Sequence, residues 1–346
     1  MSTVNPSRVR DLLLVQSNER EGNRLLAYRR AGDGQLAPIG IHPTGGVGDG
    51  AAHLPSQGSV VVAGDGAHVL VTNAGSGDVS VFTVDDDGGL SLAATALTGP
   101  APKSVAEHAG LVYVLSVGNA SVTGFRLAPS GLAPIPGSTR QLAEGADPAQ
   151  VGFSPDGATL LVTDRAANAL VTFPVQASGA LGEAMTSASC GPTPYGFAFT
   201  PSGTLVVTEA FGAQKGKAAA SSYRLAGASP TPVSRSLGNG RSEICWAVAT
   251  RDGRYVFTTN FADGAVSRYA VAADGSLELQ DATAGLAVDG HTGLRDAALS
   301  GDGRFLYAID ADTQRIYGWS LDGLGALTPL GSWPGATATL AGLAVG

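Results

Sequence analysis

Short apolar segments separated by turn residues repeat along the whole chain. In one example, Ser59–Ala63 is followed by Asp65-Gly66, by Val69–Asn73 and by a third segment that ends near Phe82. Alternating apolar and polar positions over such short lengths are typical of antiparallel strands, and Asp-Gly supplies the positive φ that two-residue hairpins require. Equivalent turns occur at Asp156-Gly157, Ser202-Gly203, Asp252-Gly253 and Asp302-Gly303. The pattern predicts an all-β chain without a long amphipathic helix.

An aromatic residue marks the third strand of each repeating unit. These residues are Tyr28, Phe82, Phe125, Phe173, Tyr223, Tyr269 and Trp319. Seven units in 346 residues correspond to about 49 residues each, a length that suits a four-stranded blade. We therefore predict one domain, residues 1–346, folded as a seven-bladed β-propeller of four-stranded antiparallel blades.

The two ends of the chain indicate how the ring closes. The first unit starts at Asp11–Val15, which matches a second strand, whereas Leu340–Val345 is an apolar segment without partners in its own unit. We predict that residues 336–346 provide the inner strand of blade 1. This closure leaves no free sheet edge at the junction between the termini.

In this strand order, the starts of the inner strands and the ends of the second strands lie on the face opposite the Asp-Gly turns. Convergent polar side chains on one face of a propeller predict a ligand site. The candidate acid–base residues there are Glu209, Tyr195 and His53. The candidate substrate-binding residues are Lys103, Gln150, Arg165, Trp246, Arg295 and Gln57.

Each candidate also has a structural interpretation. Glu209 precedes a loop five residues longer than its equivalents, and its carboxylate would either act chemically or pair with a neighbouring Lys or Arg. Tyr195 would transfer a proton or form an aromatic floor. The cations would bind a carboxylate or pair with Asp164 and Asp296, and His53 would be merely exposed.

Composition narrows the classes of partner. The net charge is −8, without a run of Lys or Arg, which argues against nucleic acid and anionic membranes. Two cysteines and five scattered histidines offer neither a disulfide framework nor a metal motif, and no cofactor is indicated. No apolar run is long enough for a membrane span or a secretion signal. We expect a cytoplasmic protein, unless a signal has been removed, that binds an anionic small molecule.

Two segments carry a resemblance to a known family. Phe153–Gly157 followed by Leu161–Asp164, and Gly191–Phe199 followed by Thr208-Glu209, resemble the lactonase-like seven-bladed propellers. That family includes bacterial 6-phosphogluconolactonases and fungal 3-carboxy-cis,cis-muconate lactonizing enzymes. Its members commonly have Pro-Arg-His at the start of a first strand and Asn-Glu at the end of a second strand. Thr208-Glu209 matches the latter, whereas Tyr195 follows Pro194 where the family has arginine.

The resemblance implies an enzyme that acts on a small anionic lactone or its ring-opened acid by hydrolysis, cyclisation or isomerisation. Glu209 would be the general acid or base, Tyr195 or His53 would assist, and Lys103 and Arg295 would hold the carboxylate. One alternative is a non-catalytic propeller that binds a small ligand or a protein through the same face. Another is a specialised biosynthetic cyclase or isomerase on this scaffold. Fold alone does not choose among them.

Overall fold

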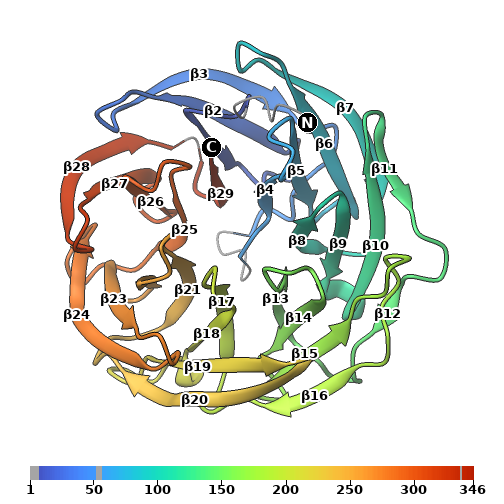
Figure 1. Ribbon diagram of the computed structural model, residues 1–346. Helices are drawn as coiled ribbons and strands as arrows, with labels where there is room; N and C mark the ends of the chain where they lie inside the picture. Colours follow the sequence, from blue (N-terminus) through green and yellow to red (C-terminus); the bar gives the residue numbers. More distant parts are fainter. Residues whose placement is uncertain (1–7, 52–56, 336) are drawn as a thin grey trace, which may run out of the picture.

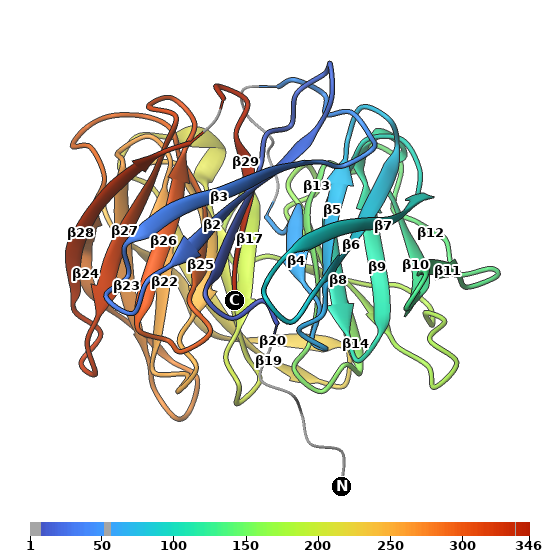
Figure 2. The ribbon, with the colours of Figure 1, turned by 90° about the horizontal axis from the view of Figure 1, so that it is seen from above.

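Seven antiparallel sheets form a closed ring around a central axis (Figure 1). The computed structural model describes residues 8–51, 57–335 and 337–346. Seen from the side, the inner strands run along the axis in the same direction, and they begin at the same end of the ring (Figure 2). This arrangement confirms the predicted seven-bladed propeller.

The strands of each blade follow one another outward from the axis. Blade 1 contains β29 (Ala341–Val345), β1 (Leu12–Gln16), β2 (Arg24–Arg30) and β3 (Leu36–Pro43). Blade 2 contains β4 (Val60–Val62), β5 (His68–Asn73), β6 (Asp78–Val84) and β7 (Leu90–Leu97). Blade 3 contains β8 (Pro102–His108), β9 (Leu111–Ser116), β10 (Ser121–Ala128) and β11 (Gly131–Pro134), with β12 (Arg140–Gln141) also paired to β10. Blade 4 contains β13 (Pro148–Phe153), β14 (Thr159–Asp164), β15 (Ala169–Pro174) and β16 (Met185–Ala188).

The remaining three blades keep the same order. Blade 5 contains β17 (Pro194–Phe199), β18 (Thr204–Glu209), β19 (Ala219–Ala226) and β20 (Ser229–Gly238). Blade 6 contains β21 (Ile244–Ala249), β22 (Tyr255–Asn260), β23 (Ala265–Val271) and β24 (Leu277–Leu286). Blade 7 contains β25 (Leu294–Leu299), β26 (Phe305–Asp310), β27 (Arg315–Leu321) and β28 (Leu327–Pro334). In the described residues, helix is limited to the short 3-10 segments η1 (Val117–Asn119) and η2 (Phe211–Ala213).

The C-terminal strand closes the ring as predicted. β29 pairs antiparallel with β1, and Val15 lies opposite Leu343 in the register. Leu340 and Leu343 are buried in the same core cluster as Leu13, Val15 and Tyr28. The last segment of the chain is therefore both a hydrogen-bonded strand and a part of the core between blades 1 and 7.

The core lies between neighbouring blades rather than within any one of them. All seven marker aromatics lie on the third strand of their blade, as predicted, and all are buried. Phe82 of blade 2 lies in the same core cluster as Leu12 and Leu14 of blade 1, and Tyr28 of blade 1 lies in the same core cluster as Tyr307 of blade 7. Burying side chains of this size stabilises each junction by about 1.5–3 kcal/mol per residue.

The Asp-Gly turns differ from the two-residue hairpins that we predicted. Gly157 has a φ of +69°, as expected, but β13 ends at Phe153 and β14 begins only at Thr159. Asp156 accounts for the longer turn, because its Oδ1 accepts hydrogen bonds from Ser154 Oγ and from the Ala158 N–H. The Asp side chain thus closes the turn locally, as Asx turns do.

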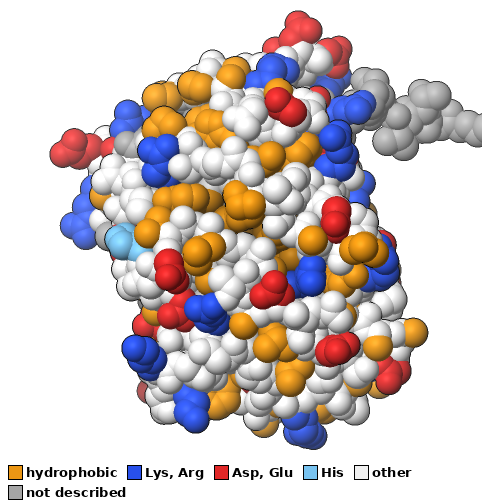
Figure 3. Space-filling view, turned by 90° about the vertical axis from the view of Figure 1, so that its left-hand side faces the viewer, with side chains coloured by type: hydrophobic (Ala, Val, Ile, Leu, Met, Phe, Trp, Pro, Cys, Tyr) orange, Lys and Arg blue, Asp and Glu red, His pale blue; other side chains and the backbone are white. Residues whose placement is uncertain are grey.

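We call the end of the ring that carries these turns the hairpin face, and the end where the inner strands begin the loop face. On the side of the ring formed by blades 6 and 7, acidic, basic and apolar side chains are interspersed (Figure 3).

Within residues 8–51, 57–335 and 337–346, we find no helix with the length and apolar character needed to cross a membrane.

Candidate functional site

Four consecutive inner strands begin with a bulge at the loop face. In β13, β17, β21 and β25 the register shifts by one residue near the start of the strand. A bulge of this kind redirects side chains away from the regular alternation of a strand. The bulged positions hold Ala149 and Gln150, Tyr195 and Gly196, Cys245 and Trp246, and Arg295 and Asp296. Lys103 occupies a similar bulge in β8. Five of the sequence-predicted site residues therefore lie at a local irregularity in the sheet.

Two arginines stack on an aromatic cluster at these strand starts. Tyr195 and Trp246 contact each other edge to face, with ring centroids 5.7 Å apart, and Phe261 packs against the same cluster. The guanidinium carbon of Arg165 lies 4.9 Å from the centre of the Tyr195 ring, and that of Arg295 lies 5.5 Å from the centre of the Phe261 ring. These distances allow cation–π attraction. We call these five residues the arginine–aromatic cluster.

Arg295 is a buried cation without a counterion in the part of the chain that the structure describes. It is 3% exposed, and it forms no ion pair or side-chain hydrogen bond among the described residues. Its Nε and Nη1 have no hydrogen-bond partner there, and burial lowers the pKa of its guanidinium, an effect that nearby Asp312 and Asp310 oppose. An unpaired polar group in such a place costs about 1–3 kcal/mol, and more when it is charged. A bound anion would remove this penalty.

The pairing of Arg295 with Asp296, one of our sequence interpretations, does not occur. The Asp296 carboxylate instead accepts hydrogen bonds from the N–H groups of Gly58, at 3.4 Å, and Leu343, at 3.3 Å. Both residues lie in the bulge at the start of β25, where the register shift redirects side chains away from the regular alternation of the strand. Asp296 consequently ties the inner edge of blade 7 to blades 1 and 2.

The other two cations predicted to bind substrate are already paired. Lys103 Nζ lies 3.0 Å from Asp49 Oδ2, and Arg165 Nη2 lies 2.5 Å from Asp147 Oδ1. The expected pairing of Arg165 with Asp164 is therefore wrong, because Asp164 Oδ1 accepts hydrogen bonds from the N–H groups of Ala166 and Ala167 in its own turn and from the Asp147 N–H before β13. Arg295 differs from both in having no carboxylate at contact distance among the described residues.

Tyr195 and Cys245 keep their protons at neutral pH. Burial raises the pKa of the Tyr195 phenol far above its ordinary value, and Arg165 and Arg295 offset only part of this effect. Burial likewise raises the pKa of the Cys245 thiol. Tyr195 can consequently donate a hydrogen bond to a ligand but cannot serve as a base, and Cys245 is not a nucleophile.

Glu209, the leading acid–base candidate, is enclosed within blade 5. It is 0% exposed. Its carboxylate accepts hydrogen bonds from Gly191 N–H at 2.8 Å, Ser221 Oγ at 2.5 Å, Ser236 Oγ at 2.7 Å and, more weakly, Ser189 Oγ at 3.5 Å. In other blades, Asn73 and Asn260 occupy the same strand end and also bond to neighbouring polar groups. This geometry supports a structural role, with hydroxyls in place of the expected Lys or Arg.

Replacing Glu209 should therefore change stability. Glu209→Ala leaves several buried donors unsatisfied and is expected to lower the free energy of unfolding by roughly 2–4 kcal/mol, measured by urea titration. Glu209→Gln, which keeps one acceptor oxygen and the side-chain volume, should lose less. A Glu209→Gln protein with unchanged stability and abolished ligand binding or turnover would restore the catalytic interpretation.

Gln57 and Gln150 bind backbone groups of other inner strands. Gln150 accepts from Phe197 N–H at 2.7 Å and donates to Phe197 O at 3.2 Å. Gln57 makes the same pair of bonds with Ala247, crossing from blade 2 to blade 6. Gly196 leaves room for this crossing, because a Cβ there would lie 2.7 Å from Gln57 Oε1. Both amides thus tie the inner strands together, and a role in binding substrate remains a prediction. His53 lies outside the described residues.

Two residues of the site escaped the sequence interpretation. Phe261 follows Asn260 at a strand end where the equivalent residues of other blades are Ala74, Ala210 and Ala311, so the substitution of an aromatic for alanine was a visible signal. Glu243 directly precedes β21, and its carbonyl accepts the Phe261 N–H at 2.8 Å. Burial, together with the nearby Asp263 carboxylate, raises the pKa of Glu243.

Asp296 should make stability depend on pH. Burial raises the pKa of its carboxyl from 3.8 to about 7. As pH rises from 4 to 7, the unfolded chain ionises this group while the folded chain keeps it protonated, so ionisation favours unfolding. The resulting penalty reaches roughly 4 kcal/mol and stays constant above pH 7. Asp296→Asn retains an acceptor for both N–H groups and is expected to stabilise the protein at pH 8 but scarcely at pH 4.

Urea titrations at the two pH values would measure this difference. Asp87→Asn provides the control, because Asp87 is exposed at the hairpin face and its replacement changes the net charge equally. An equal effect of Asp296→Asn at both pH values would contradict the assignment.

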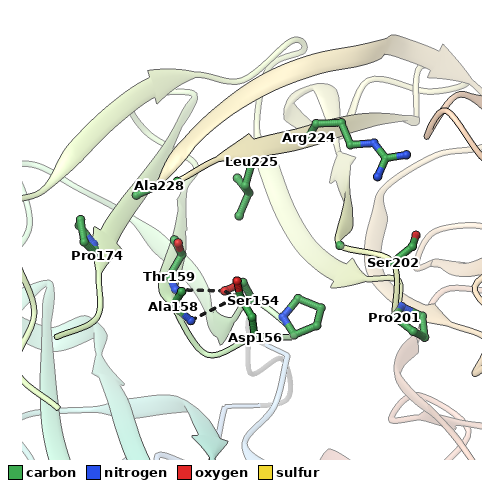
Figure 4. Close-up of a pocket in the computed structure, with 13 residues that line it drawn as sticks. Ser154, Asp156, Ala158, Thr159, Pro174, Pro201, Ser202, Arg224, Leu225 and Ala228 are labelled. Carbon is green, nitrogen blue, oxygen red and sulfur yellow. Dashed lines mark hydrogen bonds between the residues drawn. The ribbon is translucent and has the colours of Figure 1, made fainter. Parts of the chain in front are cut away.

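A cavity lies elsewhere, between blades 4 and 5 at the hairpin face (Figure 4). Its volume is about 550 Å³, and Ser154, Asp156, Pro201, Arg224 and Leu225 contribute to its walls. The Asp156 carboxylate within it is engaged by the turn, as described above. None of the predicted site residues lines this cavity.

In the part of the chain that the structure describes, no group of three or more His, Cys, Asp or Glu could hold a metal ion.

Comparisons with known proteins agree with this architecture. The family model described as "Lactonase, 7-bladed beta-propeller" matches residues 104–210 and 206–341. A Bacteroides fragilis protein assigned as a 6-phosphogluconolactonase is 19% identical, with a TM-score of 0.75 and coverage of 98% of this chain and 99% of that one. The Pseudomonas aeruginosa periplasmic gluconolactonase PpgL is 20% identical, with a TM-score of 0.74 and coverage of 95% and 98%. No curated protein matches the chain.

At these identities the structural neighbours establish the likeness of the fold and leave the reaction open. The family match is independent of them and spans more than half of the chain. This protein therefore belongs to the seven-bladed β-propeller lactonase family.

Proposed function

We propose that this protein hydrolyses a small lactone at the arginine–aromatic cluster on the loop face. The observation that carries the proposal is Arg295, a buried guanidinium without a counterion among the described residues. In lactone hydrolysis, water adds to the carbonyl carbon, and the carbonyl oxygen becomes an oxyanion. The ring C–O bond then breaks, the departing alkoxide takes up a proton, and a hydroxy acid carboxylate remains. A fixed guanidinium would stabilise the charge at each of these stages.

The other residues of the cluster have complementary roles in this proposal. The protonated phenol of Tyr195 donates a hydrogen bond, while Trp246 and Phe261 form an apolar wall that excludes water. Arg165 stacks on Tyr195 and is paired with Asp147, and Lys103, on the inner strand of blade 3, is paired with Asp49. The established identity of the family and the lactonase names of structural neighbours support this class of reaction.

Glu243 is the carboxylate that we propose as general base for the attacking water. It directly precedes β21, and its charge helps to raise the pKa of the Cys245 thiol, next to Trp246 of the cluster. The raised pKa of Glu243 lies closer to neutral pH than that of an ordinary glutamate, and a general base works best when its pKa is near the working pH. His53 remains a predicted second acid–base group. Ring closure of the hydroxy acid, the reverse reaction, would use the same residues, as would a specialised cyclase.

Non-catalytic binding of a carboxylate is the second candidate function. The enclosure of Glu209 favours it, because the family's matching glutamate position is not presented to a ligand in this chain.

A panel of five- and six-membered lactones, followed by proton release, tests the proposal. Hydrolysis by the wild type that falls at least about tenfold in Glu243→Gln, with binding of the product acid retained, is the expected result. If the wild type turns over none of the lactones but binds hydroxy acids through Arg295, binding without catalysis is the function.

A further inference from the structure

The charges at the arginine–aromatic cluster leave one cation free. Of the three cations predicted to bind substrate, Arg165 and Arg295 belong to the cluster and Lys103 lies at the start of β8. Two of the three have a carboxylate within 3.0 Å: Lys103 with Asp49, and Arg165 with Asp147. Arg295 has no such partner in the described chain, although Asp310 and Asp312 are near enough to favour its charged form. Among the described residues of the cluster, the charge available to a ligand is therefore that of a single guanidinium.

The two ion pairs are held by further contacts, so they do not readily release their cations. Asp49 Oδ1 also accepts hydrogen bonds from Asn18 Nδ2 at 2.8 Å and Ala51 N–H at 2.9 Å. The Asp147 backbone is fixed at both ends, because its N–H donates to Asp164 and its carbonyl accepts from the Arg165 N–H. Arg165 is further held by its stacking on Tyr195.

Carboxylates and phosphate esters differ in what they require of such a site. A carboxylate carries one negative charge and matches one guanidinium, often through two parallel hydrogen bonds. A phosphate monoester carries a charge of about −1.5 to −2 near neutral pH and has three strong acceptor oxygens. At Arg295 the additional charge would be buried without compensation, close to Asp310 and Asp312.

We infer that this site accepts one anionic group, a carboxylate, and does not favour phosphate esters. The ligand class is accordingly a non-phosphorylated hydroxy acid and the lactone that corresponds to it. This inference rests on the proposed function for its reaction, but the selection itself is a property of binding and can be measured without turnover.

Calorimetric titration with gluconate and with its 6-phosphate is the direct test. The wild type is expected to bind the two acids with affinities within about threefold, and Arg295→Met should reduce both by about tenfold or more. Asp147→Asn frees the guanidinium of Arg165 and is expected to improve binding of the phosphorylated acid about tenfold relative to gluconate. Asp87→Asn, with the same change in net charge far from the cluster, should leave the ratio unchanged.

Several results would overturn the inference. They are a wild type that binds the 6-phosphate more than about tenfold tighter than gluconate, an unchanged ratio in Asp147→Asn, and the absence of Arg295-dependent binding of either acid. Failure of the proposed function is recognised separately. A wild type that binds gluconate through Arg295 but hydrolyses no lactone removes the hydrolase and leaves the selection in place.

Discussion

Deletion of residues 336–346 is expected to abolish cooperative folding of the ring at 25 °C. The deletion removes β29, the inner strand of blade 1, and exposes the unpaired edge of β1. It also removes Leu340 and Leu343 from the core. Buried leucines cost about 2–5 kcal/mol each when truncated to alanine, and the total stability of a domain is only about 5–15 kcal/mol. Circular dichroism during thermal unfolding would measure the loss.

Single substitutions separate the packing of β29 from the effect of shortening the chain. Leu343→Ala should lower the free energy of unfolding by roughly 2–5 kcal/mol. Leu324→Ala is the matched control, because Leu324 is 74% exposed on a blade 7 turn and its truncation should change stability by less than about 0.5 kcal/mol. A deletion protein that melts like the full chain would show that closure does not depend on β29.

Replacement of Arg295 by methionine is expected to reduce kcat/KM for the preferred lactone by about 10²–10³-fold. Methionine keeps much of the volume that packs against Phe261 and removes the charge. The same change should preserve or raise the melting temperature, because a buried charge without a partner destabilises the folded state. Arg295→Lys should recover only part of the rate, since an ammonium cannot form the planar pair of hydrogen bonds that a guanidinium forms.

This opposite movement of activity and stability distinguishes a functional arginine from a structural one. Initial rates and thermal melts on the same preparations provide both measurements. Arg165→Met is an informative comparison, because Arg165 has Asp147 as its partner and its loss leaves that carboxylate unpaired. A melting temperature that falls in Arg295→Met while kcat/KM is unchanged would assign Arg295 to the scaffold.

At the candidate site, residue patterns predict the face on which a residue lies, whereas packing determines where its side chain points. The arginines, Tyr195 and Trp246 were placed on the loop face by their repeat positions, and the bulges in β17, β21 and β25 lie at the strand starts concerned. Glu209 was placed on the same face by the same logic, yet two strands and a loop of blade 5 enclose its carboxylate. A repeat position specifies where a Cα lies, and the direction and partners of a side chain depend on neighbours distant in sequence.

Contacts between distant parts of the ring also cannot be predicted from repeat positions. Lys103 pairs with Asp49 of the connection between blades 1 and 2, and Gln57 bonds to the backbone of Ala247 across the ring. Nothing local to these residues identifies such partners. Arg295 stands next to Asp296 in the sequence, but the Asp296 carboxylate, in the bulge of β25, accepts hydrogen bonds from the N–H groups of Gly58 and Leu343 instead.

Residue patterns along the chain are enough to predict the ring: the seven aromatic third strands, the four-stranded repeat and the C-terminal strand that completes blade 1. These features follow from the periodic pattern of buried apolar residues, which can be recognised within each repeat. Which charges are compensated follows from the folded arrangement of the blades and not from these patterns. Compensation depends on side chains that different blades bring to one place, and among the described residues this left Arg295 without a counterion while enclosing Glu209 among serine hydroxyls.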